Sequence, residues 1–338
     1  MRRQPQGAGD MISSMQRRGW LRASLAALAL GLPALGCWAQ AYPARPVRLI
    51  LPFPAGGTAD AVTRHLAHKM SLALGKPFVV DNVVGAAGTI GLAQGLRAAP
   101  DGYTITQISN TNTVAALHMF KRLPFDPRKD MVPVASLFQI PSAVVTNSRG
   151  SAFGSFAEML AYARANPGKL SYAYSHATGA VAGASVKQAS GIDIVAVPYK
   201  SGPQAVVETL SGEMPLLFTD LGAVLPQIRA GKLKALAVTS AQRSALLPEV
   251  PTLREVLPGA TEFTGWSGFV VPVGTPRAVV DKLHETLQQI LASEDTASFL
   301  RGLGGEPMPM SADEFARFIK DQEPLWAKAL AAAGIAPE

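Results

Sequence analysis

Segments with strand-like and helix-like hydrophobic patterns alternate along the chain after residue 41. Apolar positions spaced three and four apart predict helices such as Ser155 to Asn166 and Arg277 to Ala292. This alternation is typical of an α/β protein with mainly parallel sheets. The short apolar runs that predict strands are Val47 to Phe53, Phe78 to Asn82, Thr104 to Ile108, Val132 to Phe138, Ser142 to Val145, Leu170 to Tyr174, Ile194 to Val197, Leu216 to Thr219, Ala235 to Val238 and Gly268 to Val271.

So many strands need two sheets, and the chain therefore predicts two lobes. Proline-containing segments around Met131 to Ser142 and around Phe263 to Pro272 are the best places for the chain to cross between the lobes. We expect residues 42–142 plus 268–338 to form a discontinuous first lobe and residues 143–267 to form the second. Two α/β lobes joined by crossing strands form a hinge with a cleft between them.

The first predicted strand ends in a turn with almost no side chains. In VRLILPFPAGGTADAVTRHL we expect a helix to begin just after Gly57, with Thr58 as its N-cap and Asp60 in its first turn. The first N–H groups of such a helix have no partner within it, and glycines without a Cβ atom let a ligand approach the main chain. The turn therefore indicates an anion site, and the alternative is a short connection that binds nothing.

Other candidate positions follow from the expected topology. In open α/β sheets ligands bind beyond the carboxyl ends of the strands, so the turns after Ile108, Tyr174, Val197 and Phe218 are candidates. Asn110 follows one of these strands and is a candidate ligand contact. Asp220 follows another, where a structural role at a helix N-terminus and a polar ligand contact are both open.

Residues 1–41 have the pattern of a secretory signal peptide. Arg17 and Arg18 precede an uncharged stretch that ends in Ala39-Gln40-Ala41, a site of the kind that signal peptidase cuts. We therefore expect export to the periplasm. Lipoprotein anchoring at Cys37 is the less favoured alternative, because Ala34 stands where a lipoprotein signal has leucine.

The charge of the chain favours small-molecule partners. The formal net charge is +7, and removal of the five basic residues and one acidic residue of positions 1–41 leaves +3. So small a charge gives no reason to expect nucleic acid or an anionic membrane as a partner. Cys37 is the only cysteine, so cleavage after Ala41 excludes disulfides and thiolate metal sites.

Motifs for catalysis, metals and nucleotides are incomplete. Gly265-Trp266-Ser267-Gly268 is similar to a nucleophile elbow but has Phe269 where that motif has glycine. His65 and His68 lie three residues apart without an accompanying HExxH pattern, so we interpret them as exposed residues of a solvated helix face. Gly85-Ala86-Ala87-Gly88 lacks the first G-x-G element of a dinucleotide fingerprint. We expect no cofactor, no metal and no enzymatic activity.

Several segments in order resemble the Bug family, the solute receptors of tripartite tricarboxylate transport systems. The resemblance covers nearly the whole chain after the signal and implies a two-lobed periplasmic binding protein that closes over a small carboxylate. The segments are YPARPVRLILPFPAGGTAD (Tyr42 to Asp60), DNVVGAAGTIG (Asp81 to Gly91), AAPDGYT (Ala98 to Thr104), LPFDPRKDMVPVA (Leu123 to Ala135), ANPGKLSYA (Ala165 to Ala173), IDIVAVPYKSG (Ile192 to Gly202), LPQIRAGKLKALAVTS (Leu225 to Ser240) and GWSGFVVPVGTPRAVVDKL (Gly265 to Leu283).

The resemblance also implies where the ligand binds. In the family the PFPAGG turn holds a carboxylate, partly through main-chain N–H groups and ordered water. Asp60 then either orders this turn as a helix N-terminal charge or binds a ligand ammonium. The residues that match the turn here are Phe53, Pro54, Ala55, Gly56, Gly57 and Thr58.

The loop that follows Leu170 to Tyr174 departs from the family pattern. It reads YSHATGAVAG and is shorter than in the family, and Ala180 stands where a helical histidine is usual. We keep Ser175, His176 and Thr178 as candidate ligand contacts.

The function that these observations predict is capture of a small carboxylate outside the cytoplasm. The carboxylate could be a di- or tricarboxylate, an amino acid or an aromatic acid, and the receptor, a monomer, would deliver it to a membrane transporter of the tripartite tricarboxylate type. Two alternatives stay open: an orphan carboxylate sensor for a membrane sensor kinase, and a secreted α/β hydrolase.

Overall fold

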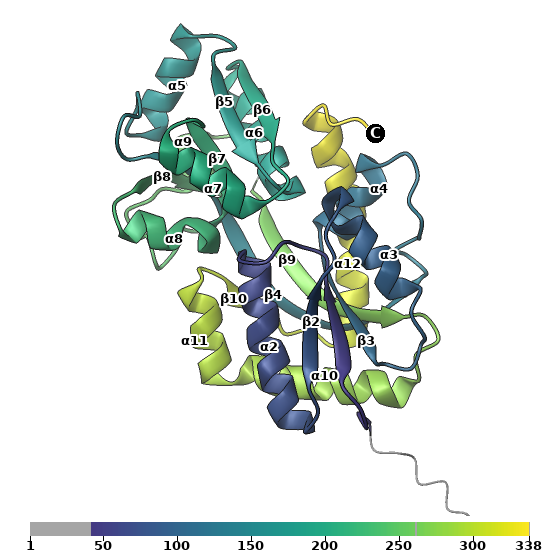
Figure 1. Cartoon of the computed structure of the whole chain (residues 1–338). Coiled ribbons are helices and arrows are strands. Elements are labelled where there is room, and N and C mark those ends of the chain that lie inside the picture. The colour runs from purple at the N-terminus through teal and green to yellow at the C-terminus, as the bar shows by residue number, and fades with distance from the viewer. Residues whose placement is uncertain (1–41, 261, 338) are drawn as a thin grey trace, which may run out of the picture. The chain divides into compact units, whose positions relative to one another are not determined.

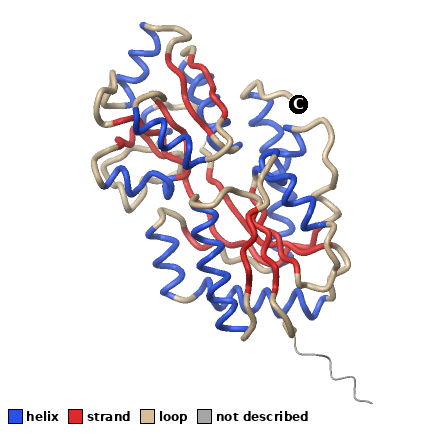
Figure 2. The backbone as a smooth tube through the Cα atoms, in the orientation of Figure 1, coloured by secondary structure: helices blue, strands red, loops and turns tan. Residues whose placement is uncertain are grey.

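The computed structural model describes residues 42–260 and 262–337, and Pro43–Glu338 forms one compact unit. The expected signal peptide at residues 1–41 lies outside the described residues. Helices and strands alternate through the described chain, as Figures 1 and 2 show. Every helix in this part of the chain is too short or too polar to cross a bilayer.

Ten strands are described, and most begin or end within two residues of the predicted positions. They are β1 (Val47–Leu51), β2 (Phe78–Asn82), β3 (Thr104–Ser109), β4 (Met131–Asn147), β5 (Leu170–Tyr174), β6 (Ile194–Pro198), β7 (Leu216–Asp220), β8 (Leu233–Val238), β9 (Thr264–Pro272) and β10 (Glu306–Pro307).

The helices lie mainly between strands, as expected for an α/β chain. Ser155 caps α5 with its side chain, and α10 has the predicted bounds. The helices and helical turns are α2 (Thr58–Leu74), the 3-10 turn η1 (Ala86–Gly88), α3 (Thr89–Leu96), the π-helical turn η2 (Thr111–Ala115), α4 (Ala116–Met119), α5 (Phe156–Ala165), α6 (Ala177–Ser190), α7 (Gly202–Ser211), α8 (Leu221–Arg229), α9 (Leu253–Val256), α10 (Arg277–Ala292), α11 (Glu294–Gly302) and α12 (Ala312–Ala332).

Two sheets share strand β4. Sheet A has the order β2-β1-β3-β9-β4 with β10 also on β4, and sheet B has the order β4-β7-β5-β6 with β8 also on β4. Pairs without β4 or β9 are parallel, and every pair that contains β4 or β9 is antiparallel. We call sheet A with its helices lobe 1 and sheet B with its helices lobe 2. The two-lobed α/β fold class is thus confirmed, whereas the residue boundaries of the lobes stay a prediction.

Strand β4 corrects the sequence analysis, which predicted two separate strands here. Its residues up to Pro141 pair with β9, and from Ser142 onward it pairs with β7. Proline has no N–H to donate, so inside sheets it is confined to edges and irregular positions. Pro141 is tolerated because it lies where β4 changes partners. The strand therefore runs on from one sheet into the other.

The core follows the two-residue period of the strands. In β4, Val144 packs in a cluster with α5 and α9, whereas Ala143 and Val145 pack in a cluster with α7 and α8. Sheet B is therefore covered on both faces, which Figure 1 shows as the group of teal and green elements. In lobe 1, Trp266 of β9 packs edge-on against Phe315 of α12, with 5.9 Å between ring centroids.

One predicted surface residue is partly buried. His65 of α2 stacks on Phe299 of α11 with 4.2 Å between ring centroids, and its Nε2 lies 3.1 Å from Thr296 Oγ1. The interpretation of His65 as an exposed residue is therefore wrong, because α11 covers this face of α2, whereas His68 is exposed. Within residues 42–260 and 262–337 no three histidine, cysteine or acidic side chains could hold a metal ion together.

The burial of His65 predicts a pH dependence of stability. Burial lowers the pKa of His65 below its usual 6.5, so the folded state resists a proton that the unfolded state accepts. The free energy of unfolding should fall as pH drops below 6.5, by at most about 1.4 kcal/mol per pH unit, and level off below the folded pKa. Urea unfolding at several pH values between 8 and 5 measures this change in the free energy of unfolding. His65→Gln should flatten this part of the curve and the control His68→Gln should not; equal curves for both variants would contradict the prediction.

Candidate functional site

The turn after β1 brings bare main chain to the start of α2. Gly56 has φ +82°, in the left-handed region that favours glycine, and its N–H donates to Asp60 Oδ2 over 3.1 Å. Gly57 is the N-cap, with φ −89° and ψ 173° and no side-chain cap. The prediction that Thr58 caps the helix is therefore wrong. The hydrogen bond from Gly56 N to Asp60 closes the turn before Thr58, so Thr58 is already the first helical residue.

This geometry leaves donors at the N-terminus of α2. The N–H groups of Thr58 and Ala59 have no acceptor within the helix, and Gly57 has no side chain that could accept from them. A Cβ atom at Gly57 would have Pro54 O, at 3.9 Å, as its nearest neighbour. Ala55 and Gly56 are exposed. The turn can therefore admit an anion at the positive end of the helix dipole.

Asp60 orders the turn. Its carboxylate accepts from Gly56 N, from Arg64 Nε at 3.0 Å and from Asn82 Nδ2 at 3.1 Å. Burial disfavours the charged form, but the hydrogen bonds from Arg64, Gly56 and Asn82 outweigh it and hold the pKa of Asp60 below its usual 3.8. Asn82 also donates to Phe53 O over 2.9 Å. Of the two interpretations of Asp60, these bonds favour the structural one.

In lobe 2, the candidate residues after β5 lie at the start of α6. His176 is the N-cap of α6, and its Nδ1 accepts from Gly179 N over 3.3 Å. Thr178 is buried in the first turn. Ser175 lies near the start of α7: a Cβ atom at Gly202 would lie 3.4 Å from Ser175 Oγ.

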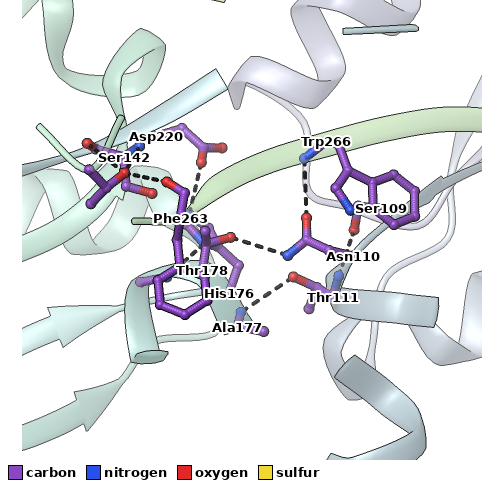
Figure 3. Close-up of polar contacts among 12 residues, drawn as sticks. Ser109, Asn110, Thr111, Ser142, His176, Ala177, Thr178, Asp220, Phe263 and Trp266 are labelled. Atoms are coloured by element: carbon purple, nitrogen blue, oxygen red, sulfur yellow. Dashed lines mark hydrogen bonds and ion pairs between the residues drawn. The ribbon is translucent and has the colours of Figure 1, made fainter. Parts of the chain in front are cut away.

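Asn110 and Thr111 join lobe 1 to lobe 2, as Figure 3 shows. Asn110 Nδ2 donates to Thr178 Oγ1 over 3.3 Å, and Asn110 Oδ1 accepts from Trp266 N over 3.3 Å. Thr111 Oγ1 accepts from Ala177 N over 3.3 Å. A hydroxyl of lobe 1 therefore satisfies one of the free N–H groups at the start of a lobe 2 helix.

Asp220 completes this arrangement. It is the N-cap of α8 but does not cap that helix with its side chain. Its Oδ1 lies 3.4 Å from His176 Nε2. At Gly222, a Cβ atom would lie 3.1 Å from Thr58 Oγ1, so the start of α8 in lobe 2 packs against the start of α2 in lobe 1.

The structure thus brings most of the candidate residues of the two lobes close to one another. Asn110 contacts Thr178, and His176 contacts Asp220. The start of α8 at Gly222, two residues after Asp220, packs against Thr58. Sequence reasoning missed Thr111, Gly222 and Ser142, the cross-strand neighbour of Asp220 in β4. Thr111 follows β3 next to Asn110, so its position after a strand was an available signal. The candidate ligand contacts themselves stay predictions.

A strained turn lies beside the β1–α2 turn. Ala86 and Ala87 have φ 44° and 53°, and within the described residues they are the only non-glycine residues with positive φ. A Cβ atom at the adjacent Gly88 would lie 3.3 Å from Phe53 Cε1. Alanine carries no signal for this conformation, so the sequence did not predict it.

The possible nucleophile Ser267 lies in an extended strand. It is buried in the middle of β9, and its Oγ has no hydrogen-bond partner in the described part of the chain. A nucleophile elbow needs a strand-to-helix turn, which this position does not provide.

Comparisons with known proteins agree with this fold. The model of the tripartite tricarboxylate transporter family receptor matches residues 62–335. The chain belongs to this family. Protein BugT of Bordetella pertussis is 34% identical over 295 residues, which cover 86% of this chain and 89% of BugT. The resemblance to the Bug family is therefore confirmed, and the chain is a solute-binding receptor and not an enzyme.

Solved structures show the same fold. The periplasmic binding protein BugD has a TM-score of 0.83 and 32% identity, and the match covers 88% of this chain and all of BugD (100%). A protein of R. palustris solved with adipate has a TM-score of 0.83 and 31% identity, with 88% of this chain and 100% of that chain covered.

The bonds of Asn110 predict a measurable loss of stability. Asn110→Ala removes the acceptor of Trp266 N and the donor to Thr178, and leaves buried polar groups unpaired, which costs about 1–3 kcal/mol per group. Thr178→Val removes the interlobe bond alone and should cost less. Denaturant unfolding of both variants measures the difference. If Asn110→Ala unfolds at the same denaturant concentration as the unchanged protein, these bonds do not stabilise the fold.

Proposed function

We propose that this protein is a periplasmic receptor that captures a small carboxylate between its two lobes and delivers it to a membrane transporter. The observation that carries the proposal is the turn from Pro54 to Thr58. Free N–H donors and the helix dipole attract an anion there, and Gly56 and Gly57 leave its approach open. Arg64, the arginine of α2, is engaged with Asp60 and Asn82, so the main-chain donors are the groups that this site offers to the ligand.

The contacts of the second lobe support the same proposal. His176, Thr178 and Asp220 lie at the starts of α6 and α8, and these helix starts face the lobe 1 residues Asn110 and Thr58. A ligand held at α2 would therefore meet polar side chains of lobe 2 when the lobes close. The family and the adipate-bound relative support a carboxylate as the ligand class.

The partner is a separate part of the proposal. The family name supports a transporter of the tripartite tricarboxylate type. A sensor kinase would read the same closed form of the receptor. Uptake of the labelled ligand is measured within minutes of its addition to cells with and without this gene. This separates the two outputs, because loss of a sensor alone does not change the uptake by a transporter that is already in the membrane.

Substitution at Gly57 tests the binding site. Because Gly57 has φ −89° and open space around its Cβ position, Gly57→Val should fold and change stability by less than about 1 kcal/mol. Its side chain would occupy the space in front of the helix N-terminus and should weaken carboxylate binding by more than about tenfold. Calorimetry with a carboxylate found in a thermal-shift screen measures the affinity.

The matched control is Gly302→Val at the end of α11. Gly302 also has open space at its Cβ position and no positive φ, and it is exposed. This variant should bind like the unchanged protein. If Gly57→Val is folded by circular dichroism and still binds with unchanged affinity, the turn is not the carboxylate site.

A further inference from the structure

The two acidic side chains near the proposed cleft have very different surroundings. Asp60 has three kinds of donor around it: a main-chain N–H, the Arg64 guanidinium and the Asn82 amide. Its side chain is only 10% exposed, against 27% for Asp220. Within the described residues, the ion pairs of Asp220 include His176 and no lysine or arginine. One carboxylate is therefore satisfied by the protein and the other is not.

The contact with His176 does not pair the Asp220 carboxylate by a hydrogen bond. His176 Nδ1 is engaged in the hydrogen bond that it accepts from Gly179 N, which caps α6. His176 Nε2 lies 3.4 Å from Asp220 Oδ1 without the geometry of a hydrogen bond.

A second polar group without a partner lies beside Asp220. Ser142 of β4 is the cross-strand neighbour of Asp220 in β7, so the two side chains point to the same face of sheet B. Ser142 Oγ is completely buried and has no partner in residues 42–260 and 262–337. On the other side Gly265 has no side chain, and a Cβ atom there would lie 3.8 Å from Asp220 Oδ1. Figure 3 shows Ser142 and Asp220 beside His176.

We infer that Asp220 accepts a protonated amine of the ligand and thereby makes the receptor selective for amino-substituted carboxylates. The inference rests on the proposed binding of a carboxylate in the same cleft. A ligand whose carboxylate lies at α2 would present its ammonium to Asp220, which is 27% exposed, and the negative charge of Asp220 would be paired. An unsubstituted dicarboxylate such as adipate would instead place a second anion near Asp220, with no cation between them.

Matched pairs of ligands test this selectivity. Calorimetry at pH 7 compares L-aspartate with succinate, L-glutamate with glutarate, and L-phenylalanine with 3-phenylpropionate. Each pair has one carbon skeleton with and without the amine. In at least one pair the amino acid should bind about 10- to 100-fold more tightly, as expected for hydrogen bonds to a charged group. Asp220→Asn, which keeps the shape of the side chain, should reduce this preference to less than about threefold.

Two further variants control the experiment. Asp193→Asn removes an exposed lobe 2 carboxylate that pairs with Lys187, and it should keep the preference of the unchanged protein. Asp220→Ser gives a second measurement if the asparagine variant does not fold by circular dichroism.

Three results would overturn the inference. If unsubstituted carboxylates bind as tightly as the amino acids, Asp220 does not select an amine, while the proposed function stands. If a preference exists but survives in the folded Asp220 variants, another residue is responsible for it. If no carboxylate of any pair binds, the proposed function fails and this inference fails with it.

Discussion

Strand β4 is hydrogen-bonded into both sheets, and the relation between the lobes depends on this shared strand. Ser142 begins its pairing in sheet B, and Thr239 binds Ser142 on both sides: Ser142 N donates to Thr239 Oγ1, and Thr239 N donates to Ser142 O, each over 2.9 Å. Thr239 Oγ1 also donates to Phe263 O over 2.6 Å, just before β9 returns to sheet A. The buried residue Thr239 is therefore hydrogen-bonded to both segments in which the chain crosses between the lobes.

Around this hinge, each lobe completes helix starts or packing surfaces of the other. The hydroxyl of Thr111 in lobe 1 accepts from the first N–H of α6 in lobe 2. On the other side, the absence of a side chain at Gly222 in lobe 2 makes room for Thr58 of lobe 1. Because helix starts carry unpaired donors, they are costly to bury without partners. The Ala177 N–H at the start of α6 thus has its partner in the other lobe.

The candidate site uses main-chain donors in place of a cationic clamp. Asp60, Arg64 and Asn82 form a bonded group that holds the turn, and this group leaves the N–H groups at the start of α2 free. A main-chain site of this kind attracts any carboxylate. In the proposed function, discrimination among carboxylates comes from the polar groups of lobe 2, which include His176 and Asp220.

Local pattern alone determined the class of the fold, the alternation of strands and helices, and the bare turn before α2. These features depend on residues near one another in sequence: branched apolar runs, helical spacing, and Pro and Gly at turns. Even so, local rules placed the helix cap at Thr58 and ended a strand near Pro141. Only the tertiary structure decided those two points, together with the partners of Asn110, the pairing of Asp60 and the exposure of Asp220. The reason is physical: each depends on atoms from segments far apart in sequence, and only the folded chain decides which donors remain for each acceptor.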